Sequence, residues 1–225
     1  TKHRKKGLFY RTAKKTFELA REEGIGFIFG FPNPTSYPGF MKMEWSHDGN
    51  ISSYKLLIPT VPLGYLANKV KFLEPLYRRW FGFVAGHWKT EYRPFPNSAR
   101  GEGVGTVCHD EALLAYKPEN DTRFMLRIGK SLVWINQRAG RIGIGDIELT
   151  DDIHDLKKVL RTLKLIGFLT GSFQLSTYVS PGCRLDQHLR DIGYRARQGI
   201  AIIHLDLDSR LPLDRFKYVY ADFDT

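Results

Sequence analysis

The chain lacks the features that mark several classes of protein. Its 225 residues contain no run of 18 apolar residues, which excludes a helix that spans a membrane. No initiator methionine and no charged-then-apolar leader is visible, so the sequence shows no signal peptide. The two cysteines, Cys108 and Cys183, are too few for a disulfide scaffold or a cysteine-built zinc site. Two cysteines fit a reducing compartment, and we expect the protein in the cytoplasm.

Net charge is absent from one half of the chain and concentrated in the other. The protein carries a formal charge of +10, with 34 Lys and Arg against 24 Asp and Glu. All of the excess falls in residues 1–100, while residues 101–225 are balanced. A basic half attracts an anion such as nucleic acid, a membrane surface or a phosphorylated small molecule. Aromatic residues make up 13%, which argues against disorder.

Apolar periodicity predicts alternating helices and strands. Phe9, Ala13, Phe17 and Ala20 share one helical face, so we expect a helix over 8–23 that Gly24 ends. A buried strand over 25–31 follows, and its helical neighbour favours a parallel strand–helix–strand unit. The remaining predictions are helices over 37–43, 110–117, 156–167 and 185–192, a helix or helix pair within 63–84, and strands over 51–58, 124–128, 131–139, 141–149, 173–179, 200–207 and 216–223.

The two halves repeat one order of features without an exact period. Each has, in this order, a helix, a strand, a Pro-containing turn, a short helix, an aromatic residue preceded by Glu or Gly, and another strand. These aromatic pairs are Glu44-Trp45 and Gly193-Tyr194. The loop-like stretch over 87–105 is the best candidate boundary between the halves.

A basic turn opens the first helix. Arg4-Lys5-Lys6-Gly7-Leu8-Phe9 places three cations and a glycine where unpaired helix N–H groups and the macrodipole favour an anion. A solvated basic end explains the same residues equally well.

This turn resembles the pyrophosphate loop of the GNAT N-acetyltransferases, in which Arg or Gln and two residues precede Gly. The element Asn33-x-x-Ser36-x-x-x-Phe40-x-x-x-Glu44-Trp45 is similar to the next conserved element of that family, and Phe31-Pro32-Asn33 with Tyr37-Pro38-Gly39 looks like a bacterial and archaeal subgroup. The resemblance covers residues 1 to about 60. It implies that the chain lacks the N-terminal part of its GNAT domain and carries a second, degenerate GNAT-like unit.

The resemblance implies an α/β fold with a mixed sheet flanked by helices. We expect residues 1–62 to form the later part of an acyl-CoA-binding domain, 63–105 a helical linker, and 106–225 the second unit. The implied activity is transfer of an acetyl or other acyl group from acetyl-CoA, as co-substrate, to a small-molecule amine. Arg4, Lys5, Lys6 and the N–H groups of Gly7, Leu8 and Phe9 would hold the pyrophosphate, and Asn33 and Ser36 the pantetheine arm or adjacent backbone.

The chain departs from the family pattern at two positions. Phe9 stands where the loop usually ends in Gly or Ala, and Phe40 replaces the Tyr that many members use as general acid. We therefore predict Tyr37, the nearest phenol, as the acid that protonates the CoA thiolate, although its ring could instead pack against the Pro-rich turn. These departures keep open a non-catalytic GNAT-like binding module. A nucleic-acid-binding domain is supported by charge alone, and a homo-oligomer is left open.

Four other motifs have simpler structural explanations. Cys108-His109-Asp110 is a poor catalytic triad, because adjacent residues rarely face one another. The acidic group Asp151, Asp152, His154 and Asp155 fits a helix cap better than a metal site, and we predict no metal. Gly140-x-x-Gly143-x-Gly145 fits a bend in a sheet. We expect core packing for the aromatic group Trp80, Phe81, Phe83 and Trp88, with nucleic-acid stacking or a membrane interface as alternatives.

Overall fold

The computed structural model describes residues 7–120 and 122–223, and they divide into two compact units. Unit 1 comprises the chain up to Ile51 together with Gly199–Phe216, and unit 2 comprises Ser52–Gln198 together with the segment from Lys217. These compact units differ from the domains expected from the sequence, whose boundaries lie near residues 62 and 106. Those boundaries remain a prediction.

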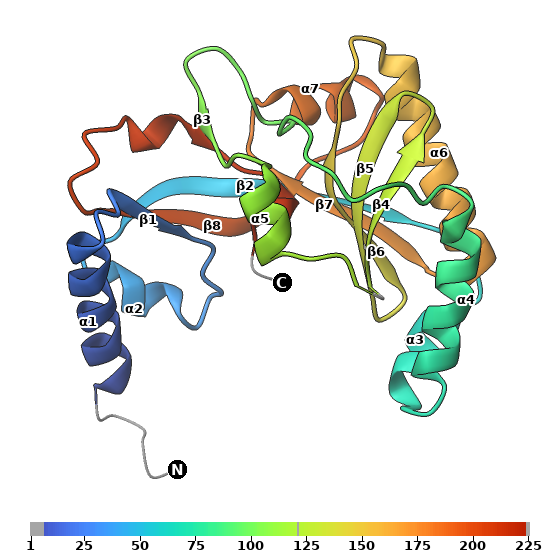
Figure 1. Cartoon of the computed structure of the whole chain (residues 1–225), viewed down its shortest axis with the longest axis horizontal. Helices are drawn as coiled ribbons and strands as arrows, with labels where there is room; N and C mark the ends of the chain where they lie inside the picture. Colours follow the sequence, from blue (N-terminus) through green and yellow to red (C-terminus); the bar gives the residue numbers. More distant parts are fainter. Residues whose placement is uncertain (1–6, 121, 224–225) are drawn as a thin grey trace. The chain divides into compact units, whose positions relative to one another are not determined.

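Both units are α/β (Figure 1). The α-helices are α1 (Leu8–Glu22), α2 (Tyr37–Met41), α3 (Leu63–Lys69), α4 (Glu74–Gly86), α5 (Glu111–Tyr116), α6 (Ile153–Thr170) and α7 (Arg184–Asp191). The strands are β1 (Phe27–Gly30), β2 (Ser46–Leu57), β3 (Gly105–Thr106), β4 (Arg123–Ile128), β5 (Ser131–Arg138), β6 (Arg141–Ile147), β7 (Gln174–Val179), β8 (Arg197–Asp206) and β9 (Phe216–Lys217). Short 3-10 turns span Leu213–Arg215 and Tyr220–Asp222.

Seven strands form one mixed sheet in the order β1-β8-β2-β7-β6-β5-β4. The predicted mixed sheet with flanking helices is therefore confirmed. The parallel arrangement expected around β1 is wrong, because β1 pairs antiparallel with β8, from the far end of the chain, with Phe27 opposite Asp206. A parallel strand–helix–strand unit does occur at β6–α6–β7, where Gly143 pairs with Ser176.

Two segments share one order of elements. Both α1–β1–α2–β2 and α6–β7–α7–β8 run helix, strand, short helix, strand. In the sheet their strands alternate, because β8 of the second segment lies between β1 and β2 of the first. The order of features noticed in the sequence is therefore found again in the order of helices and strands.

Each unit has its own apolar core. In unit 1, Ala13, Phe17 and Ala20 of α1 pack with Ile203 and Leu205 of β8, as the helical periodicity predicts. In unit 2, α6 packs on one face of the sheet (Figure 1) through buried residues that include Leu156, Val159, Leu160, Leu163 and Ile166.

Two predicted element ends are wrong for identifiable reasons. The helix expected to stop near Gly167 continues to Thr170 and ends at Gly171, whose φ of 67° is left-handed. Gly167 is needed inside the helix, because a Cβ there would lie 2.3 Å from the Cδ1 of Ile58. The strand expected over 216–223 stops at Lys217, because the Asp222 carboxylate accepts from the Val219 N–H at 2.8 Å and closes a turn.

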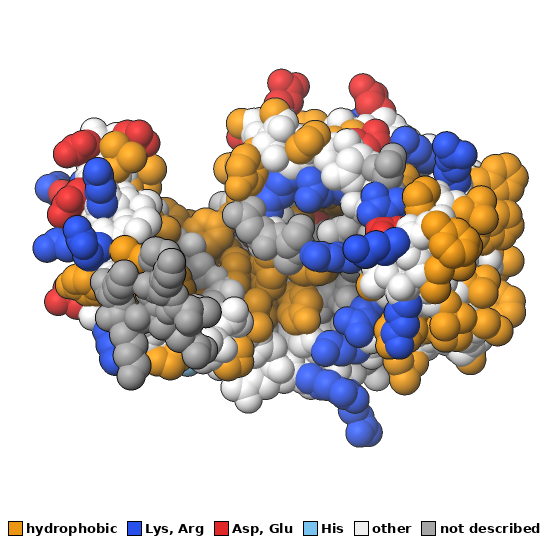
Figure 2. All heavy atoms as spheres, turned by 90° about the horizontal axis from the view of Figure 1, so that it is seen from below, with side chains coloured by type: hydrophobic (Ala, Val, Ile, Leu, Met, Phe, Trp, Pro, Cys, Tyr) orange, Lys and Arg blue, Asp and Glu red, His pale blue; other side chains and the backbone are white. Residues whose placement is uncertain are grey.

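The aromatic group expected in the core is divided. Phe81 is buried and Trp88 is partly buried against the core, as predicted. Trp80 and Phe83 are instead exposed on α4, stacked at a centroid distance of 5.9 Å. Figure 2 shows apolar side chains gathered on this side of unit 2, and the exposed ones on α3 and α4 are Leu63, Tyr65, Leu66, Leu76, Trp80 and Phe83. Among the described residues, no helix is both long enough and apolar enough to cross a membrane.

Candidate functional site

The start of α1 is organised to present backbone N–H groups. Gly7 precedes the helix in the left-handed region, with φ of 65°, where glycine is favoured. Within the part of the chain that the structure describes, no side chain caps the first turn, and that turn contains no acidic residue. The unpaired N–H groups and the positive end of the helix dipole are therefore available to an anion. The three predicted cations, Arg4, Lys5 and Lys6, lie outside the described residues.

The helix start lies against the second predicted element. The ring of Phe9 packs edge-on against the ring of Phe40 at 5.3 Å, and its Cε1 lies only 3.0 Å from where a Cβ on Gly39 would be. Gly39 therefore allows α2 to approach α1 closely. Two motifs separated in the sequence by about 25 residues thus meet in unit 1.

Asn33 and Ser36 form the turn that begins α2. The Asn33 side-chain oxygen accepts from the N–H groups of Thr35 and Ser36, both at 2.9 Å. The Ser36 hydroxyl donates to the Asn33 carbonyl at 3.3 Å and does not cap the helix. Both side chains have a clear local role, and whether they also contact a ligand stays a prediction.

Tyr37 and Phe40 belong to one aromatic group on α2. The ring of Tyr37 packs edge-on against the His47 ring at 5.6 Å. Phe40 lies 4.9 Å from Trp45, which in turn contacts Phe17 of α1. Phe40 is thus part of the packing between α1 and α2, a role that needs no hydroxyl. The acid role of Tyr37 remains a prediction.

The structure also brings together a pair that the sequence analysis missed. His204 on β8 bonds through Nδ1 to the carboxylate of Asp48 on β2, and both side chains are less than a fifth exposed. A histidine oriented by a carboxylate is the usual arrangement of a general base. The two residues are 156 positions apart, so only the pairing of strands reveals them.

The Cys108-His109-Asp110 motif divides among three environments, as expected for adjacent residues. Cys108 is exposed, and the Asp110 carboxylate caps α5 by accepting from the Leu113 N–H at 2.9 Å. His109 is buried, with Nε2 2.9 Å from Asp222 and Nδ1 3.3 Å from Asp146. The second contact has an ion-pair distance but not hydrogen-bond geometry.

The electrostatics of this buried group favour a charged histidine. Burial works against the imidazolium, but the carboxylates of Asp146 and Asp222 outweigh it and raise the pKa of His109 to about 9. The C-terminal segment is further held by Lys117, whose ammonium donates to the carbonyls of Ala221 and Phe223 at 2.7 and 2.6 Å. The group anchors this segment in unit 2 and is not a catalytic triad.

The acidic motif near residue 151 caps α6. The Asp152 carboxylate accepts from the His154 N–H at 2.8 Å, and the Asp155 carboxylate accepts from the Thr150 hydroxyl at 2.9 Å. Within the described part of the chain, no three His, Cys, Asp or Glu side chains are placed to hold a metal ion. Gly140 lies in the β5–β6 turn with φ of 73°, in agreement with the expected sheet bend.

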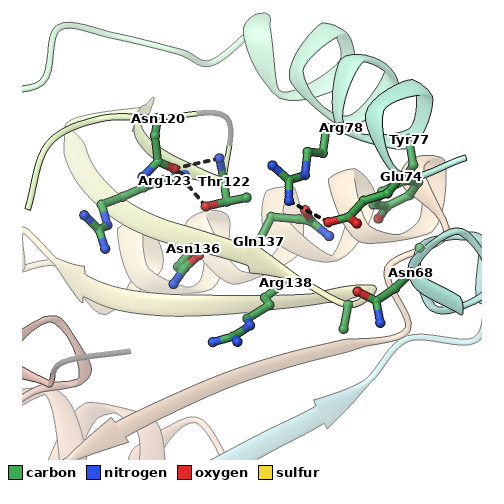
Figure 3. Close-up of a pocket in the computed structure, with 12 residues that line it drawn as sticks. Asn68, Glu74, Tyr77, Arg78, Asn120, Thr122, Arg123, Asn136, Gln137 and Arg138 are labelled. Carbon is green, nitrogen blue, oxygen red and sulfur yellow. Dashed lines mark hydrogen bonds and ion pairs between the residues drawn. The ribbon is translucent and has the colours of Figure 1, made fainter. Parts of the chain in front are cut away.

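A polar hollow lies elsewhere in unit 2, between α3–α4 and the β4–β5 strands (Figure 3). Its volume is about 420 Å³. Figure 3 shows Arg123 and Arg138 extending to the same side from neighbouring strands, with Asn136 between them. Arg78 is paired with Glu74 on α4 at 2.5 Å. Sequence reasoning did not identify this hollow.

Comparisons with known proteins address the fold. No family model matches the chain, and no curated protein matches it. Among solved structures, a conserved protein of unknown function from Enterococcus faecalis V583, described as a probable N-acyltransferase, is 13% identical with a TM-score of 0.50. The match covers 93% of this chain and 53% of that one.

Two further structures give weaker matches. The GCN5-related N-acetyltransferase from Kribbella flavida is 12% identical with a TM-score of 0.49, over 92% of this chain and 50% of that one. A putative acetyltransferase from Pyrococcus horikoshii is 11% identical with a TM-score of 0.49, over 99% and 66%. The chain therefore spans between half and two thirds of the length of these proteins. At such identities, the similarity to the Enterococcus structure shows a shared α/β fold.

Proposed function

We propose that the protein transfers an acetyl or related acyl group from acetyl-CoA to a small-molecule amine. The observation that carries this proposal is the meeting of the Gly7–Phe9 turn with the Gly39–Phe40 segment. These are the two elements in which the sequence resembles the GNAT acyltransferases. The shared fold with a structure described as a probable N-acyltransferase supports it further.

The proposed roles follow from the chemistry of each group. The cations Arg4, Lys5 and Lys6 and the N–H groups of residues 7–9 hold the pyrophosphate of acetyl-CoA. Asn33 and Ser36 contact the pantetheine arm or the backbone beside it.

In the reaction, the amine nitrogen attacks the thioester carbonyl carbon, a C–N bond forms and the C–S bond breaks. Backbone donors stabilise the oxyanion, and holding the reactants side by side supplies much of the rate. The leaving thiolate takes a proton from Tyr37, and the proton that the attacking nitrogen loses passes to solvent, from which the Tyr37 phenolate regains one.

We propose that the repeated segment α6–β7–α7–β8 is the core of a second, degenerate GNAT-like unit. The supporting observation is that both segments place a left-handed residue after the first helix, at Gly24 and Gly171, and another after the short helix, at Glu44 and Gly193. On this view residues 1–62 and 106–225 are the two units, and 63–105 join them. The free thiols of Cys108 and Cys183 fit the cytoplasmic location that we expect.

A non-catalytic module that binds acyl-CoA is the second candidate. It is favoured by Phe40, which occupies the position of the usual acid and is packed between Phe9 and Trp45. The two candidates share the acyl-CoA site and differ only in turnover.

Two measurements separate these functions. Calorimetric titration with acetyl-CoA should show binding, and Lys6→Glu should weaken it by about tenfold or more, because charge-assisted contacts to phosphate are strong. Lys130→Glu, an equal change of charge in the β4–β5 turn, should not. Unchanged affinity in Lys6→Glu would exclude the site.

The rate of turnover then tests whether Tyr37 is the acid that protonates the CoA thiolate. Release of free CoA with an amine panel should fall roughly 10²–10⁴-fold in Tyr37→Phe, at nearly constant acetyl-CoA affinity. Tyr65→Phe, on α3, is the matched control. Binding without any CoA release in the parent chain would favour the non-catalytic module.

A further inference from the structure

One face of the sheet in unit 2 carries aligned polar residues. Residues paired on neighbouring strands point to the same face, so the strand register defines rows across the sheet. One row crosses five strands, and a second, adjacent row crosses three. The first consists of Lys55, Ser176, Gly143, Asn136 and Arg123, and the second of Gln174, Arg141 and Arg138.

The opposite face of the same strands is apolar and is covered by α6. Ile135, Ile142 and Leu175 alternate with the polar residues and belong to the buried core of unit 2. A solvated face is normal for a sheet of this kind, but cations aligned across several strands are not needed for folding. The polar rows are therefore open to a ligand as well as to water.

The rows line two adjoining hollows. One hollow, of about 310 Å³, is bounded by residues of β2, β5, β6 and β7 and by Tyr178 and Tyr220. The other is the hollow of Figure 3, and the two share Asn136, Arg138 and Ala139. The first volume lies at the lower end of the range for small-molecule sites.

The first hollow has uncompensated positive charge. Lys55, Arg138 and Arg141 line it, and none of the described residues of its lining is Asp or Glu. In Figure 2, Lys and Arg side chains gather beside the exposed apolar side chains of unit 2. The nearest carboxylate in the adjoining hollow, that of Glu74, is paired with Arg78.

The neutral polar groups in the hollow are not used by the fold. Within the described chain, the side chains of Asn136, Gln174 and Ser176 make no hydrogen bond to another residue. All three are half-buried, so their donors and acceptors point into a confined space. Such groups are well suited to recognise hydroxyls.

Two tyrosines form a wall of the hollow. The rings of Tyr178 and Tyr220 lie 5.1 Å apart, and a Cβ on Gly143 would lie 2.6 Å from the Cε1 of Tyr220. The glycine thus lets the Tyr220 ring approach the strand closely. Aromatic faces of this kind support the apolar face of a ring.

We propose that this face of unit 2 binds a phosphorylated sugar, either free or as the sugar-phosphate part of a nucleotide. Arg138, Arg141 and Lys55 hold the phosphate, because guanidinium groups make paired hydrogen bonds to its oxygens. Asn136, Gln174 and Ser176 bond the hydroxyls, and the ring lies against the tyrosines. This site is independent of the acyl-CoA site proposed in unit 1.

The test is a calorimetric titration of the whole chain at low salt. The probes are glucose 1-phosphate and uridine monophosphate, with inorganic phosphate and glucose as their fragments. We expect at least one phosphorylated probe to bind about tenfold or more tightly than inorganic phosphate, and glucose alone to bind negligibly. Preference for glucose 1-phosphate identifies a free sugar phosphate, and preference for uridine monophosphate identifies a nucleotide.

Two variants locate the site. Arg138→Glu should weaken the preferred probe by about tenfold or more, whereas Lys130→Glu, an equal change of charge in the same unit, should not. Lys6→Glu should leave this binding unchanged even if it abolishes acetyl-CoA binding, so that the two proposals fail separately. Circular dichroism of Arg138→Glu checks its fold, and Arg138→Gln provides a milder change at the same position.

Three results would overturn the proposal. The first is that neither phosphorylated probe binds more tightly than inorganic phosphate. The second is that Arg138→Glu and Lys130→Glu weaken binding equally, which would reflect general charge alone. The third is that a ten-residue thymidine oligonucleotide binds more tightly than both probes and displaces them, because the polar rows would then be a single-strand nucleic-acid surface.

Discussion

The two repeated segments, α1–β1–α2–β2 and α6–β7–α7–β8, share a backbone plan but differ in how their long helices begin. Both helices are followed by a left-handed glycine, Gly24 at φ of 75° and Gly171 at 67°. Both short helices are followed by another left-handed residue, Glu44 at 63° and Gly193 at 91°. The common plan therefore lies in the turns, which tolerate few residue types.

The beginnings of α1 and α6 have opposite electrostatic character. The first turn of α1 follows Gly7 and holds no acidic residue. The first turn of α6 is capped by Asp152 and contains Asp155. The Asp152 carboxylate occupies the His154 N–H group of α6, and the charges of Asp152 and Asp155 repel an anion there, whereas the first turn of α1 holds no carboxylate. The same order of elements thus carries a side-chain cap in one segment and, in our proposal, an anion site in the other.

The largest expected effect on stability distinguishes the two glycines that end the long helices, Gly171 after α6 and Gly24 after α1. Gly171→Ala should lower the free energy of unfolding by about 3 kcal/mol, because a left-handed Ala is strained and its Cβ would lie 2.6 Å from the Val61 carbonyl oxygen. Gly24→Ala carries the same strain but meets nothing within 4 Å, so we expect a loss of about 1 kcal/mol. Urea denaturation measures both, and equal losses would mean that the close approach at Gly171 is unimportant.

The next effect is confined to unit 2 and depends on pH. The pKa of His109 is raised from 6.5 to about 9 in the folded protein. The stabilisation that protonated His109 gives the folded state is therefore complete below pH 6.5 and is lost as pH rises through about 9. We expect the free energy of unfolding to fall by up to about 3 kcal/mol between pH 6.5 and 9.5.

Denaturation curves across this range provide the check. Substitution of the exposed His87 by Gln should leave the pH dependence intact, whereas His109→Gln should remove it and lower stability at pH 6.5. A flat profile for the parent protein would show that folding takes up no proton at the buried group.

A smaller effect compares the caps of the two segments. Asp152→Ala should cost about 1 kcal/mol, since its carboxylate accepts from the His154 N–H. Ser36→Ala should cost less than about 0.5 kcal/mol, because the Ser36 hydroxyl does not cap α2. Thermal unfolding of both variants measures the difference, and a larger loss for Ser36→Ala would contradict the cap assignments.

The smallest effect concerns Glu44 and Gly193. Glu44 adopts a left-handed conformation that glycine adopts more easily, so Glu44→Gly should raise stability by about 0.5 kcal/mol after the entropy of glycine is counted. Gly193→Ala, at the matching position, should lower it by about 1 kcal/mol. If Glu44→Gly is destabilising, contacts of the Glu44 side chain must outweigh the strain.

Local signals predicted most elements, because they depend on neighbouring residues. The apolar spacing of Phe9, Ala13, Phe17 and Ala20 defined α1, and Asp110 marked the start of α5. The turn that Asn33 forms before α2 also lies within reach of sequence reasoning, since Asn favours such turns.

Long-range pairing was beyond those signals. Nothing near Ile203 indicates that β8 lies between β1 and β2, and the His204–Asp48 pair follows from that order. The rows that line the hollow of unit 2 likewise depend on the register of five strands. The end of α6 was misplaced because Gly167 serves close packing by Ile58, which a sequence pattern cannot distinguish from a stop.

The central claim is that α1, unlike α6, begins at an anion site for acyl-CoA. The most direct test is calorimetric titration of acetyl-CoA into the parent chain, Gly7→Asp and Gly7→Asn. Asn tolerates the left-handed backbone and keeps the N–H group, whereas Asp adds the negative charge that α6 already carries. We predict that Gly7→Asp binds acetyl-CoA about tenfold or more weakly than Gly7→Asn; equal affinities for the two variants, or no binding by the parent, would contradict the claim.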